Sequence, residues 1–230
     1  MKRFVVLAAV SFVALVGSGA ALAAGTPHPN WTATVSQRAN GSHTLGNPDA
    51  KVKVTEYVSY TCSHCANFTK QSDAGMRLAY VMPGKASVTV HHLIRDPIDL
   101  TVAMLVNCGD NQGFFRRHNA FMATQDKWLA KAQTASEATQ SRWSNGQVSA
   151  RMKAIADDLG FYASMQQWGY SRPAVDQCLS DQAKAKAILD QTREASELGI
   201  NGTPSFAING ELLAGVHDWA GLEIAMKAGL

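Results

Sequence analysis

The fold of this chain is decided by the stretch Lys51-Val52-Lys53-Val54-Thr55-Glu56-Tyr57-Val58-Ser59-Tyr60-Thr61-Cys62-Ser63-His64-Cys65. Residues 51–59 alternate, with three valines and Glu56 on one face, which predicts a β-strand. From about Cys62 to Val81, apolar residues recur every three or four positions, which predicts a helix directly after the strand. Two cysteines three positions apart therefore lie at a strand-to-helix junction.

This placement favours redox chemistry at the cysteine pair. Positions i and i+3 of a first helical turn share a face, so the Cα atoms can reach the separation of about 4.4–6.8 Å that a disulfide needs. Unpaired N–H groups and the helix dipole stabilise a thiolate at Cys62, which is the form that attacks disulfides. A charged His64 would strengthen this effect and make the disulfide more oxidising. The alternative for His64 is an exposed loop histidine with no such role.

Other uses of a C-x-x-C motif fit this chain less well. A zinc site usually needs a second Cys or His pair at a suitable spacing, and Cys108 and Cys178 lie far apart in the sequence. Haem attachment needs a histidine directly after the second cysteine, and Ala66 stands there. A three-residue loop makes a weak structural crosslink. We therefore expect a redox pair, no bound metal, and no cofactor other than the Cys62–Cys65 disulfide.

The N-terminus predicts export. A short basic start, the apolar run Phe4–Val16 and the small-residue pattern Ala21-Leu22-Ala23 are typical of a cleavable signal peptide over residues 1–23. A retained anchor is the alternative, although the run is shorter than the roughly 20 residues of a spanning helix. Export predicts a periplasmic protein, in a compartment where disulfides persist. The 21 basic and 18 acidic residues nearly balance, so nothing favours a nucleic-acid partner.

The remaining two cysteines, Cys108 and Cys178, bracket a helical block. In an oxidising compartment we expect them to form a structural disulfide that ties this block together. Two buried thiols, or a second redox pair, are the alternatives.

The chain order predicts an α/β fold with a helical-domain insertion. Residues 24–45 lack periodicity and are expected to form a flexible leader. The α/β domain is expected over residues 46–99 and 199–230, because strand patterns recur at 86–94 and around the Asn209-Gly210 turn. The pattern of residues 100–198 is helical throughout, which predicts an inserted helical domain.

A second motif extends the case. After the helical block comes Gly202-Thr203-Pro204-Ser205-Phe206. With both motifs in this order, residues 45–228 resemble the DsbA-like thiol:disulfide oxidoreductases of the thioredoxin-like superfamily. The resemblance implies a thioredoxin-like fold interrupted by a helical domain, and an enzyme that exchanges disulfides with exported polypeptides.

The resemblance also implies roles for single residues. Cys62 would be the exposed nucleophile and Cys65 the more buried resolving cysteine. Pro204 would be a cis-proline facing the disulfide, and the backbone of Thr203 would pair with an extended substrate. An ordinary trans turn is the alternative for Thr203-Pro204. Glu56 matches a buried acid that could exchange a proton with Cys65, or it is a strand-edge glutamate paired to a lysine.

The direction of electron flow is less defined. Strong oxidases of this family carry Pro-His where this chain has Ser63-His64, and Thr203 before the proline is more usual in isomerases and reductases. We expect a monomeric dithiol oxidase, reoxidised by a DsbB-like membrane partner. The alternatives are an isomerase or reductase served by a DsbD-like partner, and a non-catalytic peptide-binding or metal-handling protein.

Overall fold

The structure is a computed structural model that describes Met1 and residues 29–230. The predicted signal peptide lies, apart from Met1, outside the described residues. Within these residues, none of the helices has the length and apolar character needed to cross a membrane.

A six-stranded sheet organises the chain, in the order β1-β2-β4-β3-β5-β6. Its strands are β1 (Val35–Gln37), β2 (His43–Gly46), β3 (Val52–Val58), β4 (Ala86–His92), β5 (Ser205–Ile208) and β6 (Glu211–Leu212). The central pair β3 and β4 is parallel, and the other neighbours are antiparallel. The two parallel strands are joined by α1 (Ser63–Gly75), which continues into a π-helical segment, η2 (Met76–Val81).

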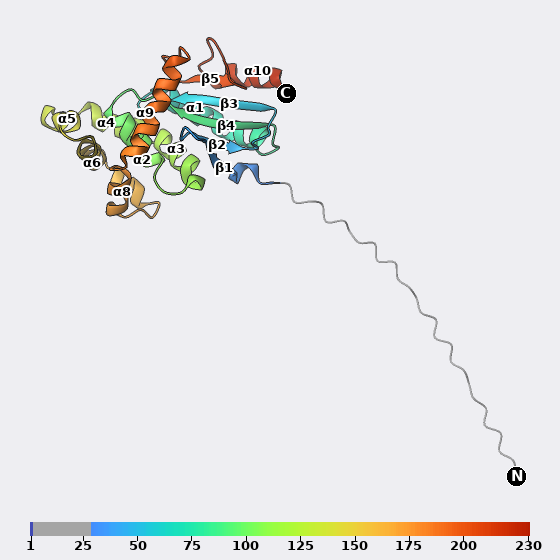
Figure 1. The fold of residues 1–230 in the computed structure, drawn as a ribbon, viewed down its shortest axis with the longest axis horizontal. Helices are drawn as coiled ribbons and strands as arrows, with labels where there is room; N and C mark the ends of the chain where they lie inside the picture. Colours follow the sequence, from blue (N-terminus) through green and yellow to red (C-terminus); the bar gives the residue numbers. More distant parts are fainter. Residues whose placement is uncertain (2–28) are drawn as a thin grey trace.

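The chain leaves the sheet after β4 and returns to it at β5. Between them lie α2 (Pro97–Val106), α3 (Phe114–Ala123), α4 (Gln125–Gln133), α5 (Glu137–Ser144), α6 (Val148–Asp158), α7 (Phe161–Gln166), α8 (Arg172–Cys178) and α9 (Gln182–Glu197). A short helix, η3 (Asn111–Gly113), precedes α3, and α10 (Trp219–Gly229) follows the last strand. Figure 1 shows α5, α6 and α8 gathered at the end of the molecule away from α10 and the C-terminus. This arrangement is the α/β, thioredoxin-like fold with a helical insertion that the sequence predicts.

The prediction of a flexible leader over residues 24–45 is wrong for its described part. Residues 31–33 form a helical turn, η1 (Trp31–Ala33), and β1 and β2 extend the sheet beyond β4. Both strands are short, and their polar residues give no alternation that a sequence pattern could detect. Pairing with β4 stabilises β2, whose four residues are all buried. The boundaries assigned to the two domains stay a prediction.

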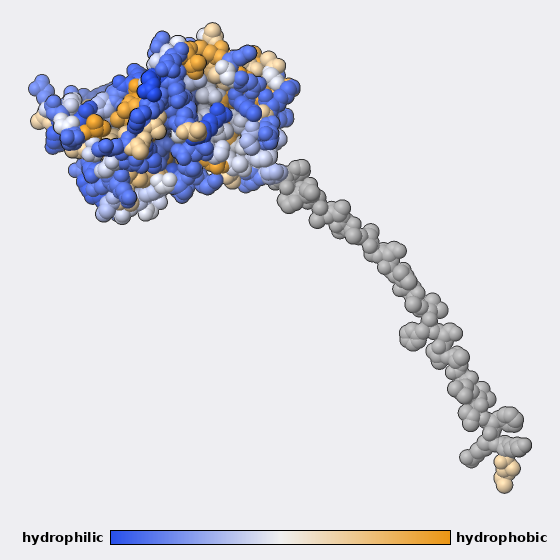
Figure 2. Space-filling view, viewed as in Figure 1, coloured by the Kyte–Doolittle hydropathy of each residue, from blue (hydrophilic) through white to orange (hydrophobic). Residues whose placement is uncertain are grey.

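The core lies between the sheet and its covering helices. Val52, Val54 and Val58 of β3 are buried, and Phe68 of α1 packs against Phe206 of β5 with ring centroids 4.6 Å apart. The face of the molecule drawn in Figure 2 is mostly hydrophilic, with apolar side chains in small scattered patches. Packing of the buried valines fixes β3 in the core. Because the chain continues from the end of β3 into α1, this packing also fixes the position of the cysteine pair at the start of α1.

Candidate active site

Cys62 occupies the N-cap position of α1, in an extended conformation with φ −91° and ψ 114°. Cys65 lies in the first turn of the helix, and both thiols are free in this structure, which therefore shows the reduced pair. Cys65 is fully buried. Cys62 was expected to be exposed, but its side chain is only 4% exposed, because its sulfur lies against the loop before β5.

The surroundings shift the pKa values of the two thiols in opposite directions. Hydrogen bonding from the Cys65 side chain, then from the Thr203 side chain and the backbone N–H groups of Cys65 and His64, outweighs burial and lowers the pKa of Cys62 to about 5. Burial raises the pKa of Cys65, and the neighbouring Cys62 and Glu56 raise it further. Near neutral pH the reduced pair therefore holds one thiolate, at Cys62, and one thiol, at Cys65.

The residues between the cysteines contribute through the backbone. Ser63 and His64 are exposed at the start of α1, and the N–H of His64 is one of the groups that stabilise the Cys62 thiolate. The imidazole of His64 makes no hydrogen bond to any residue that the structure describes. A role for the His64 and Ser63 side chains stays a prediction.

The loop before β5 faces the cysteine pair. The Thr203–Pro204 peptide bond is cis. In its protonated form, the Cys62 thiol donates a hydrogen bond to the backbone carbonyl of Thr203, with 3.2 Å between sulfur and oxygen. His217, in the loop before α10, donates from Nδ1 to the carbonyl of Pro204 at 2.8 Å. His217 has no motif in the sequence that links it to the cysteines, and only the fold brings it to this loop.

Glu56 lies behind the cysteine pair on the valine face of β3, as the strand pattern predicts. Its side chain is 4% exposed, and Oε1 has no hydrogen-bond partner among the described residues. It borders a cavity of about 40 Å³ that Thr69, Ser72 and His118 also line. Burial, followed by the charge of Cys62, raises the pKa of Glu56 to about 8. The group is therefore protonated at neutral pH and can give a proton to a thiolate.

The raised pKa of Glu56 makes a prediction about stability. Between about pH 4.5 and 8 the folded reduced protein keeps a proton that the unfolded chain has lost, so the free energy of unfolding falls as pH rises. Glu56→Gln removes this loss. We expect the reduced variant to match the reduced wild type near pH 4.5 and to be more stable by several kcal/mol near pH 8, because each pKa unit corresponds to roughly 1.4 kcal/mol.

Denaturant unfolding across this pH range measures the effect. Glu211→Gln on the exposed edge strand β6 is the matched control and should follow the wild type. Parallel curves for Glu56→Gln and the wild type between pH 4.5 and 8 would show that Glu56 keeps an ordinary pKa.

The helical insertion also reaches the segment that leads into Cys62. Asp99, fully buried in α2, accepts hydrogen bonds from the Ser59 hydroxyl at 2.6 Å and the Tyr60 N–H at 2.7 Å. Asp96 caps α2 and accepts from the Thr61 hydroxyl at 2.6 Å. The Asp96-Pro97 pair is a recognisable helix start, but only the fold shows which loop these carboxyls hold.

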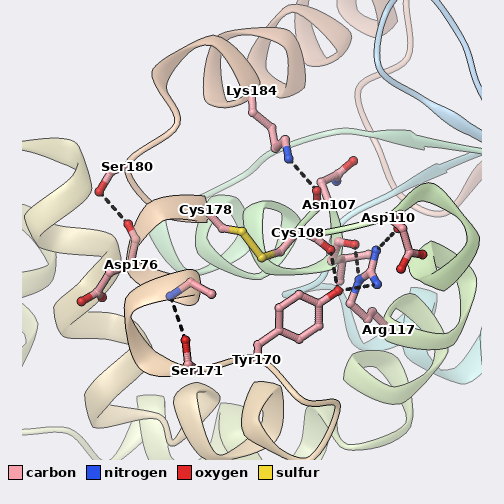
Figure 3. Close-up of a disulfide and its surroundings, with 12 residues drawn as sticks. Asn107, Cys108, Asp110, Arg117, Tyr170, Ser171, Asp176, Cys178, Ser180 and Lys184 are labelled. Carbon is pink, nitrogen blue, oxygen red and sulfur yellow. Dashed lines mark hydrogen bonds between the residues drawn. A yellow bond between two sulfur atoms is a disulfide. The ribbon is translucent and has the colours of Figure 1, made fainter.

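Cys108 and Cys178 form a disulfide that joins the end of α2 to the end of α8 (Figure 3). Their Cα atoms are 5.6 Å apart, and the two cysteines lie 70 positions apart in the sequence. Tyr170 donates a hydrogen bond to the Cys108 carbonyl, and Arg117 donates in turn to the Tyr170 hydroxyl. The disulfide lies inside the helical block and connects α2, its first helix, to α8.

The part of the chain that the structure describes has no group of three or more His, Cys, Asp or Glu residues placed to hold a metal ion. The arrangement around Cys62 is instead suited to thiol chemistry, with a stabilised thiolate, a buried partner thiol and a buried carboxyl behind them.

Comparison with known proteins gives the family. The model of the thioredoxin family matches residues 38–228, which contain both cysteines and the cis-proline loop. The chain belongs to the thioredoxin family. A protein from Rickettsia bellii with the provisional name protein-disulfide oxidoreductase is 28% identical over 168 residues. The match covers 72% of this chain but only 56% of that relative, so the chain spans little more than half of its length.

Solved structures share the fold of this thioredoxin-family chain. A protein-disulfide isomerase from Novosphingobium aromaticivorans is 44% identical, with a TM-score of 0.79, and the match covers 82% of this chain and 96% of that one. The alpha-DsbA1 protein of Wolbachia pipientis has a TM-score of 0.66 at 21% identity, over 84% of this chain and 92% of its own. The second likeness supports the DsbA-like fold alone.

Proposed function

We propose that this chain is an exported thiol–disulfide oxidoreductase that acts as a dithiol oxidase through the Cys62–Cys65 disulfide. The observation that carries the proposal is the opposite shift of the two thiols, with the pKa of Cys62 lowered to about 5 and that of Cys65 raised. A thiolate that is stabilised in the reduced protein makes the disulfide a stronger oxidant. A pKa of about 5 lies between the values of about 3.5 for DsbA and about 7 for thioredoxin.

The reaction begins with the oxidised enzyme. A substrate thiolate attacks the sulfur of Cys62, a mixed disulfide forms, and the Cys62–Cys65 bond breaks with Cys65 as the leaving thiolate. Because the pKa of Cys65 is raised, this thiolate takes up a proton, and Glu56 is the buried acid that supplies it.

A second substrate thiolate then attacks the substrate sulfur of the mixed disulfide. Cys62 leaves as a thiolate, which the N–H groups at the start of α1 stabilise. The substrate has lost two electrons and gained a disulfide, and the enzyme pair has gained those two electrons as a dithiol. This is the state that the structure holds.

The loop at Thr203 provides the substrate contact. The Thr203 carbonyl accepts a hydrogen bond from Cys62 only while that thiol keeps its proton, and the disulfide form has no such hydrogen. The carbonyl can then accept an N–H from an extended substrate chain, as in strand addition. Exported polypeptides with free cysteines are the proposed substrates.

Turnover requires that the reduced pair be reoxidised. A quinone-linked, DsbB-like membrane protein is the proposed partner, and the signal-peptide pattern of residues 1–23 supports a periplasmic location. The enzyme is proposed to act as a monomer.

A disulfide isomerase is the second candidate. It is favoured by the name of the Novosphingobium aromaticivorans protein and by Thr203 before the proline. An isomerase would be kept reduced by a DsbD-like membrane partner.

A direct assay separates these candidates. The oxidised enzyme is mixed with a peptide containing two cysteines, and loss of peptide thiols is followed, with reduction of insulin measured in parallel. We expect rapid, stoichiometric oxidation of the peptide and slow insulin reduction, because the stabilised Cys62 thiolate favours the reduced enzyme. Fast insulin reduction without peptide oxidation would favour a reductase or isomerase. Absence of both activities would favour a non-catalytic peptide-binding protein.

A further inference from the structure

Tyr60, two residues before Cys62, is held by side chains from three helices of the insertion. Its N–H donates to Asp99 of α2 at 2.7 Å, and its hydroxyl lies 3.0 Å from Nδ1 of His118 in α3. Its carbonyl accepts from Nε2 of Gln125 in α4 at 2.7 Å. Tyr60, Asp99, His118 and Gln125 are all buried, so these bonds are sheltered from water.

Gln125 makes a second contact that reaches the nucleophile itself. The same Nε2 donates to the carbonyl of Cys62 at 2.9 Å. A primary amide carries two N–H donors, and here both are directed at backbone carbonyls on either side of Thr61. The side chain of Gln125 is 3% exposed, so water does not readily replace these bonds.

This contact helps to fix the orientation of the peptide unit at the start of α1. The Cys62 carbonyl accepts from Gln125 and, at 3.3 Å, from the N–H of Ala66 in the first helical turn. Two donors on one carbonyl fix the orientation of the peptide that follows Cys62. The N–H groups of His64 and Cys65, which stabilise the thiolate, come next in the same turn.

We propose that Gln125 is a positioning residue for the nucleophile, which fixes the Cys62 carbonyl and so keeps the Cys62 sulfur directed at the N–H groups of the first turn of α1. The inserted helical domain thereby tunes the reactivity of a thiol that belongs to the sheet-bearing part of the fold. This inference rests on the proposed thiol–disulfide chemistry.

A purely structural role would have a different consequence. Loss of two buried hydrogen bonds lowers the free energy of unfolding whether or not the thiolate depends on them. Only a positioning role also changes the protonation of Cys62, because the peptide units can rotate once their carbonyl has lost its donor. The thiolate pKa and the thiol–disulfide equilibrium therefore distinguish the two roles.

The test compares Gln125→Met with Gln133→Met. Methionine matches the size of glutamine without its donors, and Gln133 is an exposed residue at the other end of the same helix. The pKa of Cys62 is read from the ultraviolet absorbance of the thiolate, and the equilibrium of the pair is measured against glutathione. For Gln125→Met we expect the pKa of Cys62 to rise by about one unit, and the equilibrium to shift about tenfold toward the disulfide. Gln133→Met should match the wild type.

Gln125→Asn is the second variant, in case Gln125→Met does not fold. Its amide is one methylene shorter and cannot reach both carbonyls, so we expect a smaller rise of the Cys62 pKa. A folded Gln125 variant with lowered stability but an unchanged thiolate pKa and glutathione equilibrium overturns the proposal. Failure of the proposed function is separately visible, because the wild type would then not oxidise a dithiol peptide although its thiolate can still be titrated.

Discussion

Replacing Cys62 by serine is expected to lower the rate of dithiol-peptide oxidation by a factor on the order of 10³ or more, to the background rate. The stabilised thiolate at Cys62 is the group that leaves in the final step, and no other described thiol has a lowered pKa. Serine can still donate to the Thr203 carbonyl, so the fold should be retained. The measurement is thiol loss from the peptide, with circular dichroism to check folding.

Cys65→Ser is the matched variant. It keeps the nucleophile but removes the resolving thiol and the enzyme's own disulfide. With the disulfide form of the peptide as partner, the Cys62 thiolate attacks one peptide sulfur and displaces the other as a thiolate, so mixed disulfides between Cys62 and the substrate should accumulate and be visible by mass spectrometry. Adducts formed on Cys65 in Cys62→Ser, together with none on Cys62 in Cys65→Ser, would reverse the assigned roles.

Removing the Cys108–Cys178 disulfide is expected to lower the free energy of unfolding by about 4 kcal/mol. The disulfide closes a loop spanning 70 residues, and without it the unfolded chain gains conformational entropy. The double replacement Cys108→Ala and Cys178→Ala avoids leaving a single free thiol. The polar contacts around the bond remain, since Tyr170 and Lys184 donate to backbone carbonyls of Cys108 and Asn107 (Figure 3).

Urea unfolding of both proteins in their oxidised form measures this loss, and dithiol-peptide oxidation serves as the control. We expect the activity to be largely kept, because the reacting thiols are Cys62 and Cys65. Equal unfolding midpoints would mean that the bond does not stabilise the helical block. Lost activity with an intact fold would make the pair part of the redox pathway.

The strand, the helix and the cysteine pair are predictable from the sequence because each has a local signal. The alternation of residues in β3 is enough to place Glu56 on a buried face, and Cys62 and Cys65 follow from spacing alone. The hairpin of β5 and β6 follows from Asn209-Gly210, where both residues have positive φ in the structure.

What the sequence could not predict depends on contacts between distant segments. Strand β2 is specified by its pairing with β4 rather than by its own pattern. The loop before Cys62 is held by the side chains of Asp99 and Gln125. These residues lie 37 and 63 positions after Cys62 in the sequence, on helices whose relative positions cannot be predicted from local patterns. The buried state of the Cys62 sulfur likewise depends on Thr203, which only the fold brings to it.

The equilibrium reduction potential of the Cys62–Cys65 pair, measured against a glutathione buffer with the Cys108–Cys178 disulfide intact, tests the central claim most directly. A lowered Cys62 pKa predicts a potential toward the value of about −120 mV that marks DsbA as a strong oxidant. A potential near −270 mV, as for thioredoxin, would contradict the oxidase assignment and identify a pair that needs a supply of electrons.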